Sequence, residues 1–166
     1  IDFHIEDAIG RTWQTGTVQL DFAMPERFEL EYVSEDGSPK RPVMLHRVIF
    51  GSIERFIGIL TEHYAGAFPV WLAPVQVTIL PIADRHNSYA QQVAKELINT
   101  DIRVEVDERT ESIGKKIRES EIKKIPYMFV VGDKETESDK VSVRKYGEGD
   151  KGQMDIAEII TEITKS

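Results

Sequence analysis

The first 72 residues carry mostly the hydrophobic pattern of β-strands. This pattern predicts three strands, over residues 17–22, 28–33 and 42–50. In the first strand apolar and polar residues alternate with a period of two, so Thr17, Gln19 and Asp21 share one face. An Asp-Gly pair followed by Pro39 predicts the turn between the second and third strands. We therefore expect an antiparallel sheet in this part of the chain.

A helix is predicted directly after the last of these strands. Apolar residues recur at helical spacing from Ile53 to Tyr64. Ser52 is a favourable N-cap, and Glu54 lies in the first turn, where the helix dipole favours an acidic side chain. Gly66 then ends the helix, because glycine readily adopts the left-handed conformation that closes many helices. The antiparallel sheet should thus lead directly into this helix.

From residue 75 onward the pattern changes to alternating strands and helices. It predicts strands over residues 75–80, 102–106, 127–131 and 140–146, and helices over residues 88–98, 112–124 and 155–164. Residues 127–131 form a continuous apolar run, which is typical of a central strand buried on both faces. Alternating strands and helices predict βαβ units and a mixed, mainly parallel sheet whose closing strand pairs antiparallel. The fold class expected for the whole chain is therefore α/β combined with α+β.

A segment rich in proline and apolar residues separates these two patterns. It contains Pro69 and Pro74 within residues 68–74, and proline interrupts regular structure. We therefore expect two domains, one over residues 1–72 and the other over residues 73–166. The sequence has neither an internal repeat nor a low-complexity segment that would change this division.

The composition of the 166 residues, with 40% hydrophobic and 30% charged side chains, indicates a globular protein. The chain has no cysteine, which excludes disulfides and thiolate metal sites within it. No apolar run approaches the roughly 20 residues that a membrane helix needs, so no membrane association is expected. The net charge of −8 argues against nucleic-acid binding through bulk positive charge, although residues 115–124 form a local basic cluster.

The start of the chain has neither an initiator methionine nor the pattern of a signal peptide. Residues 1–10 mix polar and apolar side chains and begin as if inside a strand. We therefore expect that the chain is cut from a longer protein. The absence of cysteine is compatible with a cytoplasmic location, which is the location we expect.

The most informative segment is residues 42–56, with the sequence PVMLHRVIFGSIERF. A predicted strand runs through Gly51 and Ser52 into a helix whose first turn carries Arg55. A guanidinium in that position could bind a phosphate in bidentate fashion or stack on a base. The alternative is a surface arginine on an ordinary strand-to-helix connection, and the residue pattern alone leaves both interpretations open.

Other polar residues in this half also have both functional and structural interpretations. A lone histidine in a strand, such as His46, is more often structural than a metal ligand. The amide and hydroxyl groups of Gln14, Thr17 and Gln19 are suited to orienting a small polar substrate. These three residues could equally form the solvent face of a strand. Ser52 could line a pocket or act only as a helix cap.

Residues 42–56 resemble motif 3 of the class II aminoacyl-tRNA synthetases. Upstream, residues 13–22 resemble the substrate strand of the threonyl-tRNA synthetase family. Downstream, residues 62–76 resemble the segment in which that family crosses into its anticodon-binding domain. The resemblance covers essentially the whole chain, and it implies the C-terminal part of the catalytic domain followed by an anticodon-binding domain.

The resemblance implies specific roles for residues in the first half. Arg55 matches the motif 3 arginine that binds the phosphates and adenine of ATP, and Gln14 lies where the family also contacts ATP. Thr17 and Gln19 match residues of the threonine pocket, and Ser52 is a further candidate for lining that pocket. ATP and threonine are therefore the expected small-molecule partners, with Mg²⁺ bound together with ATP.

By the same resemblance, His46 matches one ligand of a catalytic zinc ion. The family completes this Zn²⁺ site with a cysteine and a second histidine from earlier in the catalytic domain, and neither matching segment is present here. In the family, zinc takes the amino and hydroxyl groups of threonine. This bidentate contact explains the rejection of valine, which lacks the hydroxyl group.

Three segments of the second half resemble the anticodon-binding domain of class IIa synthetases: residues 114–119, 126–135 and 141–144. The resemblance implies that Glu135 and Arg144 read the anticodon, with assistance from Arg118. Carboxylate and guanidinium groups suit this task, because RNA sequence is read at the edges of splayed, single-stranded bases. A surface ion pair between Glu135 and Arg144 is the structural alternative. Thr110 departs from the asparagine that some members have, which weakens the assignment of its loop.

The function implied by the resemblance is that of a threonine–tRNA ligase. The intact enzyme would activate threonine with ATP, transfer it to tRNA(Thr), and act as a homodimer. This chain alone should be inactive, because it contains no segment that matches motif 1 or motif 2 of the class II catalytic domain.

Two alternatives remain open at the level of the sequence. The second half alone could serve as a non-catalytic tRNA anticodon-binding module. A prolyl or glycyl synthetase of the same class is the other alternative, and His46 together with residues 13–22 argues against it.

Overall fold

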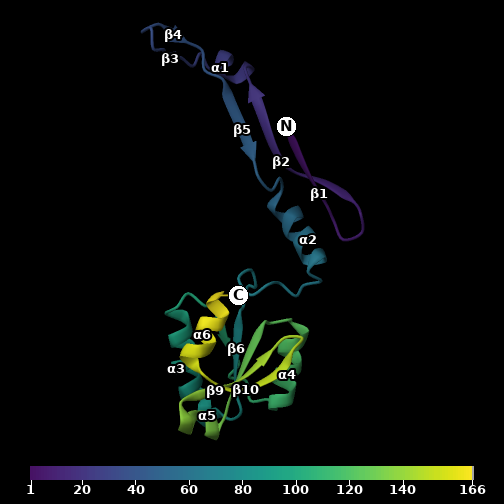
Figure 1. The fold of residues 1–166 in the computed structure, drawn as a ribbon, viewed down its shortest axis with the longest axis vertical. Coiled ribbons are helices and arrows are strands. Elements are labelled where there is room, and N and C mark those ends of the chain that lie inside the picture. Colours follow the sequence, from purple (N-terminus) through teal and green to yellow (C-terminus); the bar gives the residue numbers. More distant parts are fainter. Residues whose placement is uncertain (166) are drawn as a thin grey trace. The chain divides into compact units, whose positions relative to one another are not determined.

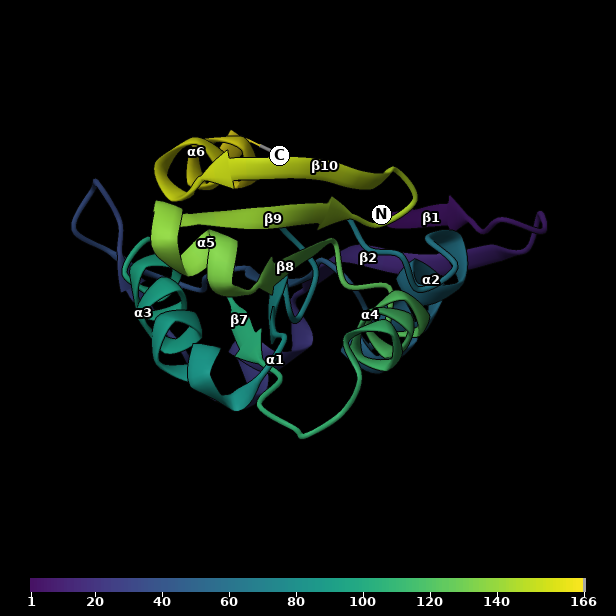
Figure 2. The same cartoon turned by 90° about the horizontal axis from the view of Figure 1, so that it is seen from below.

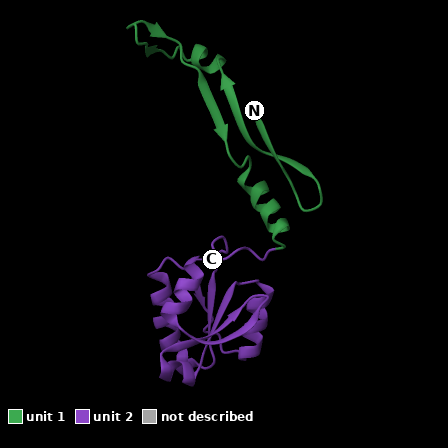
Figure 3. Cartoon of the chain, viewed as in Figure 1, with its two compact units in different colours: residues 1–65 green, residues 66–166 purple. Residues whose placement is uncertain are grey.

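In a computed structural model, which describes residues 1–165, the chain forms two compact units over residues 1–65 and 66–166 (Figure 3). The division falls after Ala65, upstream of the domain boundary expected after residue 72, and that boundary stays a prediction. Within residues 1–165, no helix is both long and apolar enough to cross a membrane.

The first unit contains a three-stranded antiparallel sheet, a two-stranded hairpin and two helices (Figure 1). Its elements are β1 (Asp2–Glu6), β2 (Thr12–Asp21), α1 (Ala23–Arg27), β3 (Tyr32–Val33), β4 (Pro39–Lys40), β5 (Met44–Val48) and α2 (Ile53–His63). The strand order of the sheet is β1-β2-β5, and β3 pairs with β4. The predicted antiparallel sheet and the helix after it are confirmed, and β1 lies in the segment that was expected only to begin as if inside a strand.

The strand predicted over residues 28–33 is wrong for most of its length. The chain forms helix α1 just before this segment, and β3 contains only two of the predicted residues. Oδ1 of Asp21 accepts hydrogen bonds from the backbone N–H groups of Ala23 at 2.9 Å and Met24 at 3.0 Å. Such local bonds favour a helical turn over extended backbone, and the chain leaves the sheet at this point.

One face of the sheet in the first unit exposes apolar side chains. Leu20 on β2 lies directly opposite Leu45 on β5, and these residues are 64% and 62% exposed. Among the large apolar side chains of residues 1–65, Ile59 is the one that is buried, at 8% exposure. Large apolar side chains exposed side by side in this way are typical of a face that packs against another protein segment.

The second unit is a mixed five-stranded sheet with helices on both faces (Figure 2). Its elements are β6 (Val77–Pro81), the short 3-10 helix η1 (Asp84–His86), α3 (Asn87–Ile98), β7 (Val104–Val106), α4 (Ile113–Ile122), β8 (Tyr127–Val131), α5 (Asp133–Ser138), β9 (Lys140–Lys145), β10 (Gly149–Asp155) and α6 (Ile156–Lys165). The strand order is β10-β9-β8-β6-β7, with β6 parallel to β7 and β8 and the other pairs antiparallel. The predicted mixed sheet is confirmed, whereas α5 and β10 were not predicted.

Alternate residues of the central strands point into one hydrophobic core. These residues are Val77, Ile79, Tyr127, Phe129, Val131, Val141 and Val143, each with 0% exposure. Helices α3 and α6 cover this side with residues such as Val93 and Ile159. Helix α4 packs against β6 on the other side of the sheet (Figure 2). Coverage of both faces explains the continuous apolar run of residues 127–131.

At the carboxyl ends of β6 and β8, a buried histidine joins two loops. Nδ1 of His86 accepts the backbone N–H of Ala83 at 3.3 Å, and its Nε2 lies 2.9 Å from Oδ1 of Asp133. Because Nδ1 accepts, Nε2 carries the proton and donates to the carboxylate. Arg85 binds the same carboxylate with Nε at 3.0 Å and Nη2 at 2.6 Å. This cluster fixes Asp133 at the first residue of α5.

Residues 66–166 should fold alone, because nearly all of the buried core lies within them. Phe129→Ala should lower the free energy of unfolding of this fragment by about 3–5 kcal/mol, since it removes a fully buried ring. Ile122→Ala, at a position 71% exposed, is the control and should change that free energy by less than about 0.5 kcal/mol. Urea denaturation followed by circular dichroism measures both effects. A fragment without a cooperative transition would contradict the prediction.

Asp133→Asn should lower the melting temperature of the chain at neutral pH. The Arg85 guanidinium, and next His86, hold the pKa of Asp133 well below its usual range. A carboxylate of this kind adds stability above its unfolded pKa of about 3.9, and the added stability is lost as the pH falls toward the folded pKa. The difference in melting temperature between wild type and variant should therefore be largest above about pH 5 and become smaller below about pH 4.

Thermal melts over a series of pH values measure this difference. Glu158→Gln removes an exposed carboxylate from α6 and serves as the control, which should show no comparable dependence on pH. A difference between wild type and Asp133→Asn that stays constant down to about pH 3 would contradict the assignment.

Candidate functional site

A β-bulge in β2 brings Gln14 and Thr17 to the same face of the sheet. Asp2 pairs with Thr17 but His4 pairs with Gln14, so β2 has one more residue than β1 between these pairs. Gln14 Nε2 and Thr17 Oγ1 both donate to Oδ1 of Asp2, at 2.8 and 2.7 Å. A regular strand would place residues three positions apart on opposite faces. The bulge therefore unites two candidate residues that the alternation alone would separate.

Gln19 continues this face and lies directly opposite His46 on β5. Both residues line a depression of about 690 Å³ together with Asp21. Nε2 of His46 is 2.8 Å from Oδ2 of Asp21. The structure thus brings together the predicted metal ligand and one predicted substrate contact, while Thr17 lies on the same face outside the depression.

The sequence placed Asp21 on the face of Thr17 and Gln19 without assigning it a site role, yet it orients His46. Hydrogen bonds from the backbone N–H groups of Met24, and next from His46, lower the pKa of Asp21, so it is ionised at neutral pH. An ionised carboxylate only accepts hydrogen bonds, so Nε2 of His46 donates, and in the neutral imidazole Nδ1 carries the lone pair. The available signal was the position of Asp21, two residues beyond Gln19 on the face that meets His46.

Ser52 and Arg55 lie at the start of α2. Ser52 Oγ accepts the backbone N–H of Arg55 at 3.4 Å and donates to Oε2 of Glu54 at 2.7 Å, so it is a helix cap. The side chain of Arg55 is exposed, and neither residue lines the depression around His46. The structure therefore groups Gln19 with His46, while Ser52 and Arg55 lie outside that group.

His46 can supply one metal ligand, through Nδ1. Among residues 1–165, no group of three or more histidine, aspartate or glutamate side chains is arranged to hold a metal ion. A catalytic zinc site normally needs three protein ligands. The described residues can therefore contribute one ligand to such a site but cannot form the site by themselves.

Glu135 is held in the first turn of α5 by two neutral donors. Its Oε2 accepts the backbone N–H of Gly132 at 3.0 Å, and its Oε1 accepts the hydroxyl of Ser142 at 2.8 Å. A Cβ at residue 132 would lie 2.7 Å from Cδ1 of Ile82 and 3.2 Å from Oε2 of Glu135, so a side chain there would displace these groups. Glu135 as a whole is 9% exposed. Two neutral donors, rather than a cation, hold its carboxylate in position.

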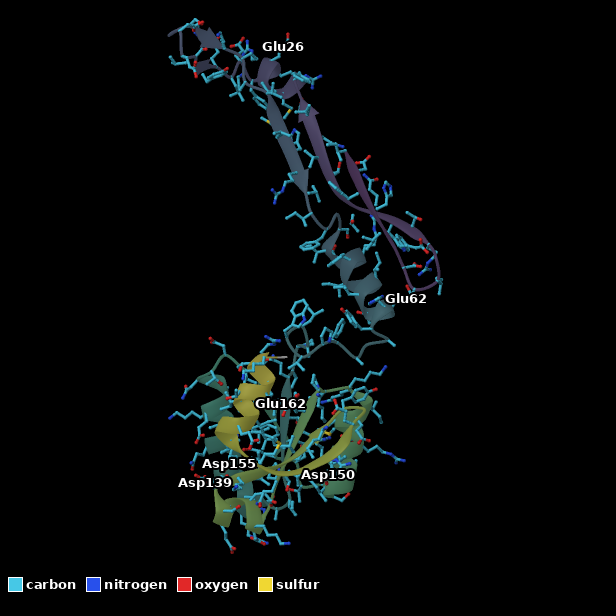
Figure 4. All side chains as sticks on the ribbon, in the orientation of Figure 1. Glu26, Glu62, Asp139, Asp150, Asp155 and Glu162 are labelled. Carbon is cyan, nitrogen blue, oxygen red and sulfur yellow. The ribbon has the colours of Figure 1, made fainter. Side chains whose placement is uncertain are left out.

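Arg144 lies on β9 and faces the same side of the sheet as Ser142, two residues earlier. Its Nη1 is 3.3 Å from Oδ2 of Asp150 on β10. Asp150 is labelled on the second unit in Figure 4. The Nε of Arg144 is buried and has no hydrogen-bond partner among residues 1–165. Glu135, Ser142 and Arg144 line one depression of about 570 Å³. A buried donor without a partner is rare in folded proteins, which marks this guanidinium for attention.

Glu135 and Arg144 are each engaged with other partners, Gly132 and Ser142 in one case and Asp150 in the other. The simple ion pair between them, which was the structural alternative, is therefore not the arrangement in this structure. Instead, one depression offers an incoming molecule both a negatively charged acceptor and a positively charged donor.

Arg118 lies apart from this depression. It is exposed on α4 and lines a second depression of about 540 Å³ together with Tyr146. Ile117, the preceding residue of α4, lines the depression of Glu135 and Arg144. The structure therefore groups Glu135 with Arg144. Arg118 lies in a separate depression, next to Ile117 on α4.

Two protein families match the chain. Residues 76–166 match the family of anticodon binding domains, and residues 1–64 match the tRNA synthetase class II core domain (G, H, P, S and T). The first match covers most of the second compact unit, and the second match covers most of the first unit.

Proteins of the same kind are similar over nearly all of this chain. A threonine--tRNA ligase of Carboxydothermus hydrogenoformans is 61% identical over 163 residues, which are 98% of this chain and 26% of that protein. One of Desulforamulus reducens is 63% identical, with the same coverage of 98% and 26%. The chain thus spans about a quarter of the length of these curated relatives.

A solved structure gives the same result. The crystal structure of the RNA binding domain of threonyl-tRNA synthetase from Cryptosporidium parvum Iowa II has a TM-score of 0.87 and 36% sequence identity. The superposition covers 99% of this chain and 42% of that one. With both of its parts matched in this way, the chain belongs to the threonyl-tRNA synthetase family, with part of a class II core domain followed by an anticodon binding domain.

Proposed function

We propose that the chain acts within a threonine–tRNA ligase, where its second unit binds the anticodon loop of tRNA(Thr). The observation that carries this proposal is the depression that Glu135, Ser142 and Arg144 line on the side of the sheet opposite α3 and α6. The match of residues 76–166 to anticodon binding domains supports the same role.

The chemistry of this depression suits an unstacked RNA base. Glu135 would accept hydrogen bonds from a base, because its carboxylate has lone pairs beyond those that Gly132 and Ser142 use. Arg144 would donate, and its Nε would gain the partner that it lacks among residues 1–165. A volume of about 570 Å³ is within the usual range for small-ligand sites and accommodates one base. Arg118 would assist from the neighbouring depression.

The first unit would contribute to the activation of threonine with ATP. Arg55 would bind the phosphates and adenine of ATP, with Gln14 as a second contact and Mg²⁺ accompanying the nucleotide. Thr17, Gln19 and Ser52 would orient threonine. The shared sheet face of Gln14, Thr17 and Gln19 supports these roles. Catalysis of this kind depends on positioning and on neutralisation of phosphate charge.

His46 fits the role of one ligand of a catalytic zinc ion. Asp21 occupies its Nε2, and metal-binding histidines commonly donate their second ring nitrogen to such a carboxylate. The other ligands would come from outside residues 1–165. When bound, zinc would hold the amino and hydroxyl groups of threonine and so favour it over valine.

The wider setting of the chain is part of the same proposal. The ligase would act as a homodimer in the cytoplasm. Residues 1–72 would belong to its catalytic domain and residues 73–166 to its anticodon-binding domain. The matches of residues 1–64 and 76–166 to two families support this division.

A non-catalytic anticodon-binding module is the second candidate function. One observation favours it: the hydrophobic core of the second unit is complete within that unit, so this unit could act without the first. A prolyl or glycyl synthetase is not supported, because the similar proteins are threonine--tRNA ligases.

Arg144→Ala should weaken binding of tRNA(Thr) to the chain by about 10- to 100-fold, because an arginine that binds a base edge contributes about 1–3 kcal/mol. It should also reduce the preference for tRNA(Thr) over a transcript with a changed anticodon. Filter binding at constant salt measures both dissociation constants.

The control for this experiment is Lys95→Ala. Lys95 is an exposed cation on α3, which covers the opposite side of the sheet, so its loss removes one charge without touching the depression. This variant should change the dissociation constant by less than about threefold. Equal affinities of wild type and Arg144→Ala would reject Arg144 as a reader of the anticodon.

The isolated chain should show no threonine-dependent exchange between ATP and pyrophosphate. It carries Arg55 but no segment that matches motif 1 or motif 2, so the α-phosphate would lack part of its positioning and charge neutralisation. An exchange assay with purified chain tests this expectation. Turnover near that of an intact synthetase would refute it.

A further inference from the structure

Lys116 is a buried lysine that no step of the proposed function uses. It lies on α4 and is 3% exposed. Its Nζ donates to the carbonyl oxygen of Pro81 at 3.0 Å and to that of Asp107 at 2.8 Å. Pro81 ends β6, and Asp107 directly follows β7. One ammonium group therefore joins a helix to the ends of two neighbouring parallel strands.

The charge of Lys116 is more than packing requires. A buried ammonium is costly, and an apolar side chain of similar length would fill the same space without that cost. Both of its hydrogen-bond acceptors are backbone carbonyls. The nearby Asp107 carboxylate is not one of them, because it binds Nε of Arg109 at 2.8 Å and Nη2 at 2.6 Å. What the lysine adds is a fixed connection between these carbonyls and α4.

This connection holds the segment that joins β7 to α4, residues 107–112, here called the 107–112 loop. Lys116 holds its first residue, and the backbone N–H of Asp107 also donates to the carbonyl of Ile79 at 2.9 Å. Farther along, Arg109 binds the Asp107 carboxylate and reaches Oε2 of Glu119 on α4 at 2.7 Å. The loop is therefore tied to β6 and α4 before any ligand binds.

The 107–112 loop borders the proposed RNA-binding depression. Thr110 and Ser112 line a depression of about 350 Å³ together with Ile82. Ile82 also lines the depression of Glu135 and Arg144, so the two hollows adjoin at this residue. Ile82 directly follows β6, and Gly132, which lines the depression of Glu135 and Arg144, directly follows β8. Ligands of parallel sheets bind at such carboxyl ends of the strands.

We propose that Lys116 is a positioning residue for RNA recognition, which holds the 107–112 loop in the conformation that contacts nucleotides next to the base bound at Glu135 and Arg144. The inference rests on the proposed anticodon-binding function. Lys116 also lines the depression of about 350 Å³, but it is 3% exposed and its ammonium group donates to two backbone carbonyls, so its role is to hold the loop rather than to bind RNA itself. A loop that is ordered before binding avoids the entropy loss of ordering on association.

Lys116→Met tests this role, since it keeps an unbranched side chain of similar length and removes the donors. In the 166-residue chain it should weaken binding of tRNA(Thr) by about tenfold, as expected for the net loss of about one hydrogen bond. Amide hydrogen exchange of Asp107, Arg109 and Glu111 should become faster, whereas exchange in β6 and β8 should stay as in wild type.

Two control variants separate loop positioning from general stability. Ser120→Ala changes a buried polar residue of the same helix whose Oγ bonds to the carbonyl of Lys116, and it should leave affinity and loop exchange unchanged. Val93→Ala opens a cavity in the core on the opposite side of the sheet and should lower the melting temperature only. A folded Lys116→Met with wild-type affinity overturns the inference, as does an equal loss of affinity in Val93→Ala.

If Lys116→Met does not fold, the wild-type chain decides the question. Saturation with tRNA(Thr) should slow amide exchange at Thr110 and Ser112, and unchanged exchange there overturns the inference. A wild-type chain that does not bind tRNA(Thr) at all rejects the proposed function and the inference with it. Tight binding by wild type and equally tight binding by Lys116→Met reject the positioning role alone.

Discussion

The carboxyl edge of the second sheet depends on one constraint, which is that polar groups buried there must find partners inside the protein. Lys116, His86 and Asp107 are 3%, 3% and 8% exposed, and each of them bonds to a loop at that edge. The partners are mostly backbone groups, so satisfying these side chains also fixes the course of the chain. The hydrogen bonds that satisfy these buried groups therefore also determine the shape of the surface around the depressions.

Sequence patterns predicted the second unit well because its central strands are covered on both sides. Residues 127–131 are continuously apolar for this reason, and the helices around them carry one apolar face each. By contrast, β10 has the sequence GDKGQMD, which carries no apolar alternation, because the strand is added at the sheet edge mainly through backbone bonds. Helix α5 spans only six residues, too few for a helical period to be visible.

The residues of the candidate sites also divide into those that the sequence could predict and those that it could not. Glu135, Arg144 and His46 could be named from resemblance, since family motifs record which residue types a function needs. Their partners could not be named, because Asp150 and Asp21 reach Arg144 and His46 from paired strands and Ser142 reaches Glu135 from β9 to a helix. Such pairings are properties of the folded chain. The strand predicted over residues 28–33 is wrong for a related reason, since hydrogen bonds to the Asp21 carboxylate favour the helical turn of α1 just before that segment.

The bulge in β2 makes the backbone path of that segment as important as the identity of its residues. If the same residues formed a regular strand without the bulge, Gln14 would turn away from the face of Thr17 and Asp2. Every side chain of β2 on the amino-terminal side of the bulge would exchange faces with it, although the sequence of the strand would be unchanged. The bulge thus sets the reading frame of the strand, which a comparison of residue types alone would not show.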